Sequence, residues 1–85
     1  MKNVAFTSEA FKEYNEWFET NKKWLIGIKL LIRELTMTAF KGMGKPEPLR
    51  GDWRGYGSRR IDHEHRLIYK ISEEQILILK CKGHY

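Results

Sequence analysis

Three side chains in the C-terminal half of the chain, Glu47, Arg66 and His84, are of types that perform acid–base chemistry on a phosphodiester. Cleavage of RNA through its own 2′-hydroxyl requires a base that removes the hydroxyl proton, a cation that stabilises charge on the phosphate, and an acid that protonates the leaving oxygen. A carboxylate, a guanidinium and an imidazole can fill these roles without a metal ion. The sequence therefore contains one candidate for each step, provided that the fold brings them together.

Each candidate also has an ordinary structural interpretation. Glu47 lies between two prolines, which stiffen the loop that presents its carboxylate, but it could equally be an exposed loop residue. Arg66 could pair with a carboxylate on a neighbouring strand. His84 is expected to share a strand face with Lys80 and Lys82, which would attract phosphate, or to be simply solvated.

His63 and His65 form a His-x-His pair, which in a strand places both rings on one face. Such a pair is half of a metal site that His84 or Glu64 would complete. The signal is weak, because two histidines that flank a glutamate near a turn are more often surface residues. We expect no metal ion and no other cofactor.

Sixteen Lys and Arg residues against eleven Asp and Glu give a formal net charge of +5, which favours an anionic partner such as nucleic acid, an acidic protein or an anionic membrane. Five of the six arginines lie within 17 consecutive residues, from Arg50 to Arg66. A guanidinium pairs with phosphate in a bidentate manner that lysine does not match. Trp53 and Tyr56 lie in this basic segment, where they would stack on bases or close the loop over the core.

The elements that must position these residues follow from hydrophobic periodicity, which predicts an α+β fold with a two-helix hairpin packed on a mostly antiparallel sheet. Phe11, Phe18, Trp17 and Trp24 belong to the apolar stripes of the two helices and are expected in the core. The expected elements are a strand over 3–6, a helix of about three turns that starts at 7–8 and breaks at 20–21, a second helix with an apolar stripe over 24–35, a loop over 38–57, period-two strands from 59 onward, a turn at 72–74 and a final strand over 75–82.

A chain of 85 residues supports one hydrophobic core, so we expect a single domain over 1–85. No apolar run approaches the length of a membrane span, and the N-terminus lacks the features of a signal peptide. The single cysteine, Cys81, faces with Leu77 and Leu79 and is expected to be a buried small hydrophobe rather than a nucleophile. A reducing cytoplasm is the expected compartment.

Several short motifs together resemble the YoeB toxins of the RelE/ParE superfamily. They occur in the family's order and spacing over essentially the whole chain, and they are Gly-Lys-Pro-Glu-Pro-Leu at 44–49, Ser-Arg-Arg-Ile at 58–61, Glu-His-Arg-Leu-Ile-Tyr at 64–69 and the terminal His84-Tyr85. The resemblance implies a RelE-like fold and ribosome-dependent cleavage of messenger RNA in the A site. It also implies that Glu47 is the general base, Arg66 the stabiliser of the phosphate and His84 the general acid.

The resemblance further implies how RNA and protein partners are bound. The positions expected to hold RNA are Lys45, Arg50, Arg59, Arg60 and Tyr85. The implied partners are a YefM-like acidic antitoxin and the ribosome with its messenger RNA. Operator DNA would be bound indirectly, through the antitoxin complex, and a homodimer is a further option. No membrane partner is implied.

Four positions depart from the family pattern and bear on base stacking and codon preference. Gly57 and Gly83 replace usual aromatic residues, Trp53 replaces a common leucine, and Arg50 stands where lysine is frequent. Two other functions remain open at this level. One is inhibition of DNA gyrase, as in ParE-like toxins of the same fold, and the other is binding of RNA or an acidic protein without chemistry.

Overall fold

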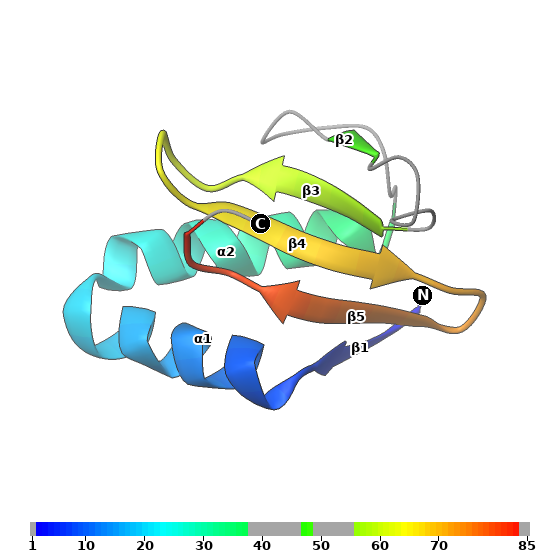
Figure 1. Ribbon diagram of the computed structural model, residues 1–85, viewed down its shortest axis with the longest axis horizontal. Helices are drawn as coiled ribbons and strands as arrows, with labels where there is room; N and C mark the ends of the chain where they lie inside the picture. Colours follow the sequence, from blue (N-terminus) through cyan, green and yellow to red (C-terminus); the bar gives the residue numbers. More distant parts are fainter. Residues whose placement is uncertain (1, 38–46, 49–55, 84–85) are drawn as a thin grey trace.

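The helices and strands of the computed structural model, which describes residues 2–37, 47–48 and 56–83, follow the predicted order closely (Figure 1). They are β1 (Asn3–Phe6), α1 (Ser8–Thr20), α2 (Lys22–Leu35), β2 (Glu47–Pro48), β3 (Tyr56–Arg60), β4 (Arg66–Ile71) and β5 (Gln75–Lys80). Within these ranges no helix is long and apolar enough to cross a membrane.

The strands of the described ranges form one five-stranded sheet in the order β1-β5-β4-β3-β2. β1 pairs with β5 in parallel, and every other neighbouring pair is antiparallel. Helices α1 and α2 form a hairpin that covers one face of this sheet, with α2 crossing behind β4 in the view of Figure 1. The prediction of an α+β fold with a helical hairpin on a mostly antiparallel sheet is confirmed.

Two residues set the ends of α1. Thr7 is the N-cap: its hydroxyl accepts a hydrogen bond from the Ala10 N–H at 3.1 Å and donates one to the Leu79 carbonyl at 3.3 Å. Satisfying an exposed helix N–H in this way stabilises the helix by about 1 kcal/mol. Asn21, with φ −156°, leaves the helical conformation and separates the two helices. The first cap therefore also fastens α1 to β5.

The core lies between the helical hairpin and the sheet. It is formed by apolar residues of both helices and of the two central strands, namely Ala10, Trp17, Leu25, Ile28, Leu31, Leu35, Leu67, Tyr69, Ile76, Ile78 and Cys81. Trp17 is buried and Trp24 packs against the core, as expected, but Phe11 and Phe18 are 56% and 55% exposed. The expectation that both phenylalanines are buried is wrong, because the sheet covers only one side of α1 and they lie outside the buried stripe.

The segment from 38 to 57, predicted as loop, contributes residues to two strands. Glu47–Pro48 forms β2 at the edge of the sheet, and β3 already begins at Tyr56. A proline has no N–H to donate, so it is tolerated in a strand only at such an edge. The high glycine and proline content of this segment predicted a loop, so neither β2 nor the start of β3 was expected.

The final strand ends at Lys80 instead of 82. Cys81 is buried as predicted, but it joins Ile76 and Ile78 in the core, whereas Leu77 and Leu79 are only half-buried. The simple alternation fails because the strand ends before Cys81, so the period of two no longer assigns its side chain to a face.

Gly57 is opposite Tyr69 in the β3–β4 register, and the tyrosine ring occupies the space next to its Cα. A Cβ at position 57 would lie 2.7 Å from the ring carbon Cε2 and 2.8 Å from the phenolic oxygen. Tyr69 is fully buried, and burial raises the pKa of its hydroxyl although a hydrogen bond with Arg59 opposes this. The Tyr69 ring can therefore occupy this buried position only because residue 57 has no side chain.

We expect Gly57→Ala to reduce the free energy of unfolding by about 1–3 kcal/mol, because the buried ring must shift to admit the methyl group. The matched control is Gly27→Ala in α2, where nothing lies within 4 Å of the new Cβ and the substitution should gain up to about 1 kcal/mol of helix propensity. Urea unfolding followed by circular dichroism measures both. Equal stability of the two variants would contradict the packing interpretation.

Candidate functional site

The register of three neighbouring strands brings two of the three predicted catalytic residues to one region. Glu47 in β2 is directly opposite Ser58 in β3. The buried Ser58 hydroxyl accepts hydrogen bonds from the Arg66 guanidinium, at 3.1 Å from Nε and 2.9 Å from Nη2. The backbone of Glu47 is therefore aligned with the serine whose hydroxyl binds the Arg66 guanidinium.

The backbone of Arg66 also holds the segment that leads to the third candidate. The Arg66 N–H donates to the Gly83 carbonyl at 2.9 Å. The Gly83 N–H donates in turn to Nδ1 of His65 at 2.6 Å. His84 itself lies outside the described residues, but the peptide that precedes it is hydrogen-bonded to the first residue of β4.

Helix α1 holds the same segment two residues earlier. The Glu13 carboxylate, only 8% exposed, accepts from the Cys81 N–H at 2.8 Å through Oε1. The indole Nε1 of Trp17 donates to the Cys81 carbonyl at 2.7 Å. The backbone N–H and carbonyl of Cys81 are thus both bound by side chains of α1, so that α1 determines where the chain leaves β5.

The lysines predicted to attract phosphate beside His84 are already paired. Lys80 Nζ lies 3.0 Å from Glu13 Oε2 and 3.3 Å from Glu9 Oε1, and Lys82 Nζ lies 3.8 Å from Glu16 Oε2. The hydrogen bond with Glu13 is the main cause that raises the pKa of Lys80, and the one with Glu9 adds to it. Three α1 carboxylates therefore face these two ammonium groups, which weakens the expected attraction of the lysine pair for phosphate.

The arginine cluster divides into residues with different roles. Arg59 is completely buried, with Nη1 3.4 Å from Glu34 Oε1 of α2 and a hydrogen bond to Tyr69. This position argues against direct contact of its side chain with RNA. Arg60 is half-buried and lines a surface cavity beside α2, together with Trp24.

His65 is a structural residue instead of half of a metal site. Its Nδ1 accepts the Gly83 N–H, its Nε2 lies 3.0 Å from Glu64 Oε2, and its ring meets the indole of Trp17 edge-on at 4.9 Å between centroids. Both ring nitrogens are therefore engaged. Among the described residues, no group of three metal-ligating side chains is present.

The turn before His65 is held by Asp62. Its Oδ1 accepts from the Glu64 N–H at 2.8 Å and from the His65 N–H at 2.6 Å. Partial burial acts to raise the pKa of Asp62, but these two donors outweigh it and lower the pKa. The local turn thus presents the His65 ring to Gly83 from a fixed backbone.

Of the remaining residues predicted to bind RNA or stack on bases, the structure describes only Tyr56. Lys45, Arg50, Trp53 and Tyr85 lie outside the described ranges. Tyr56 is described, and Nζ of Lys70 lies 5.3 Å from its ring centroid, so a cation already covers one face of this aromatic ring.

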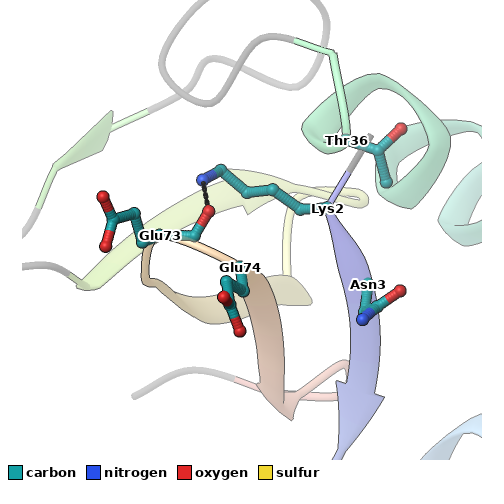
Figure 2. A pocket seen from close by; sticks show the side chains of 5 residues that line it. All are labelled: Lys2, Asn3, Thr36, Glu73 and Glu74. Carbon is teal, nitrogen blue, oxygen red and sulfur yellow. Dashed lines mark hydrogen bonds between the residues drawn. The ribbon is translucent and has the colours of Figure 1, made fainter.

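A cavity in the described part of the structure lies far from Arg66, at the other end of β4. It measures about 520 Å³ and lies near the turn into β5 (Figures 1 and 2). Lys2 donates there to the carbonyls of Ser72 and Glu73 at 2.8 and 2.7 Å, and two glutamates line the rim. Its lysine is used to hold a turn, so size alone does not identify the functional site.

Comparison with known proteins decides the family. Residues 6–85 match the family described as "YoeB-like toxin of bacterial type II toxin-antitoxin system". The chain belongs to the YoeB toxin family. It is 45% identical to Toxin YoeB of Streptomyces coelicolor over 82 residues, which cover 96% of this chain and 98% of that protein.

Solved YoeB structures share the fold over the full length. The YoeB dimer from Staphylococcus aureus matches with a TM-score of 0.92 at 40% identity, covering 99% of this chain and 98% of that one. The heterotetrameric YoeB-YefM toxin–antitoxin complex from the same organism matches with a TM-score of 0.89 at 40% identity, covering 100% and 99%. The protein is thus a YoeB toxin of a type II toxin–antitoxin system with a RelE-like fold.

Sequence reasoning missed two residues of this site, Glu13 and Ser58. It named His65 but did not predict its structural role. A signal for Glu13 was present, because it falls between Ala10 and Trp17 on the buried stripe of α1, where a carboxylate needs a partner. Ser58 and His65 lie in the motifs that carry the family resemblance, but nothing in the sequence indicated that they bind the Arg66 guanidinium and the Gly83 N–H.

We expect the Cys81 thiol to be unreactive in the folded YoeB protein. Burial, assisted by the negative charge of Glu13, raises the pKa of Cys81 to about 12, so very little thiolate exists at pH 8. Ellman's reagent at pH 8 should label less than a tenth of the protein in the time that labels it fully in guanidinium chloride. Labelling of native protein at the rate of the unfolded chain would contradict this.

Proposed function

We propose that this YoeB toxin is a ribosome-dependent endoribonuclease that cleaves messenger RNA in the A site through Glu47, Arg66 and His84. The observation that carries the proposal is the hydrogen-bonding of Arg66. Its guanidinium is bound to Ser58, which is opposite Glu47, and its N–H is bound to Gly83, which precedes His84. The strand that contains Glu47 and the residue that precedes His84 are therefore both joined through hydrogen bonds to the first half of β4, which supports this assignment.

In the proposed reaction Glu47 removes the proton of the 2′-hydroxyl, and the resulting oxygen attacks the adjacent phosphorus. The bond between phosphorus and the 5′-oxygen breaks, and His84 donates a proton to that leaving oxygen. The products are a 2′,3′-cyclic phosphate and a free 5′-hydroxyl. Arg66 stabilises the charge that develops on the phosphate, and its attachment to Ser58 fixes the guanidinium before the substrate arrives.

We expect Glu47→Gln, Arg66→Ala and His84→Gln each to reduce cleavage at least about a hundredfold, because each removes one proton transfer or the charge-stabilising group. The triple variant should be scarcely slower than the slowest single one, since the groups act as a unit. The measurement is mapping of new 3′ ends on a defined messenger bound to ribosomes.

The matched control is Lys70→Ala, which removes an exposed charge from the same strand as Arg66 and should keep near-normal cleavage. If Glu47→Gln and His84→Gln both cleave normally while folded, the assignment is wrong. Inhibition of DNA gyrase without new 3′ ends would favour the ParE-like function, and RNA binding without either activity would favour a basic binding module.

The proposed protein partner is a YefM-like antitoxin with an acidic segment that covers the site. The net charge of +5 favours such a partner, and a relative of 40% identity forms a complex with YefM. Messenger RNA on the ribosome is the proposed substrate, so the cytoplasm is the proposed location, and operator DNA would be reached only through the antitoxin complex. A homodimer is proposed from the YoeB dimer of Staphylococcus aureus.

Expression of this chain alone should arrest growth, and co-expression with a small acidic antitoxin gene adjacent to its own should restore it, because the antitoxin covers the charged site. The measurement is colony formation after induction, with Arg66→Ala as the inactive control. Normal growth in the presence of verified folded toxin would count against this function.

A further inference from the structure

The two ring nitrogens of His65 have different hydrogen-bonding roles. The ring is only 15% exposed, and Nδ1 accepts the Gly83 N–H at 2.6 Å, so this nitrogen carries no proton. Nε2 lies 3.0 Å from Glu64 Oε2 and carries the proton that it donates to the carboxylate. The ring therefore acts as a hydrogen-bond acceptor for the backbone N–H of Gly83, the residue directly before His84.

Four backbone groups of the C-terminal segment are bound. The N–H and carbonyl of Cys81 are bound by Glu13 and Trp17, and those of Gly83 by His65 Nδ1 and the Arg66 N–H. Chain termini usually fray unless they are held in this way. Since β5 already ends at Lys80, the side chains of Glu13, Trp17 and His65 and the backbone N–H of Arg66 hold the chain after that point.

We propose that His65 is a positioning residue for the general acid: its Nδ1 fixes the Gly83 peptide so that His84 is presented to the leaving oxygen. This inference rests on the proposed function, in which His84 protonates that oxygen. Displacement of a catalytic group by about 1 Å can cost a hundredfold in rate. Gly83 has φ +78°, a conformation that costs a non-glycine residue about 1 kcal/mol or more, so the backbone geometry between His65 and His84 favours glycine at this position.

The acceptor and the ring can be separated by two substitutions. His65→Phe keeps an aromatic ring of similar size against Trp17 but has no acceptor for the Gly83 N–H. His65→Asn loses the ring but places a carbonyl oxygen close to the position of Nδ1. A positioning role through the hydrogen bond predicts that the asparagine variant is the more active of the two, whereas a role in core packing predicts the reverse.

The decisive comparison uses two messengers, one with the natural 5′-oxygen at the cleaved bond and one with sulfur in its place. A thiolate leaves without protonation, so loss of the acid step affects only the oxygen linkage. We expect His65→Phe to cleave the oxygen linkage 10- to 100-fold more slowly, on the order of part of a general acid's contribution, and the sulfur linkage within about threefold of the unaltered protein. His84→Gln should give the same pattern, and His65→Asn should stay within about fivefold on both linkages.

Exchange of the Gly83 amide hydrogen, measured by NMR in the free toxin, tests the positioning without any RNA. We expect exchange at least tenfold faster in His65→Phe than in the unaltered protein and in His65→Asn. Near-ultraviolet circular dichroism verifies the fold, and His65→Leu, which also lacks an acceptor, replaces His65→Phe if that variant does not fold.

Three results would overturn the positioning role: equal losses of His65→Phe on both linkages, normal cleavage of the oxygen linkage by that variant, or unchanged Gly83 exchange. A failure of the proposed function looks different. In that case the unaltered protein cleaves neither messenger, while the Gly83 exchange still reports whether His65 holds the peptide.

Discussion

The carboxylate of Glu13 is the point at which the helical hairpin, the sheet and the C-terminal segment are joined. One oxygen binds the ammonium group of Lys80, the last residue of β5, and the other accepts from the N–H of Cys81, the residue after it. A buried carboxylate is costly unless its lone pairs are satisfied, and here both oxygens are hydrogen-bonded. Removing the carboxylate would leave the buried Cys81 amide without its partner and the half-buried Lys80 ammonium with Glu9 alone, which is why the geometry of the chain beyond Lys80 depends on this residue.

A second polar contact of the same kind joins the other helix to the other side of the sheet. Arg59 in β3 is buried against Glu34 in α2, and the Tyr69 hydroxyl shares the same guanidinium. Each helix is thus attached to the sheet by carboxylates, Glu9 and Glu13 in α1 and Glu34 in α2, in addition to the apolar core between them. A domain of this size buries only about 60% of the surface of its unfolded chain, so such contacts also select one arrangement of helices and sheet.

What the sequence predicted, and what it did not, follows from the range of the interactions involved. The boundaries of β1 and the apolar stripe of α2 depend on local periodicity, and they were predicted correctly. β2 was missed because two residues that include a proline carry no periodicity, and their pairing is decided by β3. The exposure of Phe11 and Phe18 was missed because the stripe shows which residues align along a helix, not how wide a surface the sheet covers.

The same distinction applies to the site. Residue types and motif spacing identified Glu47, Arg66 and His84 as candidates, because the chemistry needs those functional groups. Their supports were not identifiable, since each joins positions far apart in the chain: Glu13 and Cys81 are 68 residues apart, and His65 and Gly83 are 18 residues apart. A histidine in a His-x-His pair suggests a metal ligand only as long as the partner of each ring nitrogen is unknown.

The division of the basic residues has a consequence for how this small domain reconciles stability with function. Arg59, Lys80 and Lys82 face carboxylates of the two helices, so their charges are balanced within the fold. The Arg66 guanidinium is bound by a neutral group as well, since the buried Ser58 hydroxyl accepts from both Nε and Nη2. Two hydrogen bonds to one fixed oxygen orient the plane of the guanidinium before any anion binds, so less side-chain entropy is lost on binding. The chain therefore uses carboxylates of the helices to attach the sheet, and a buried serine to orient the guanidinium to which the proposed function assigns the phosphate.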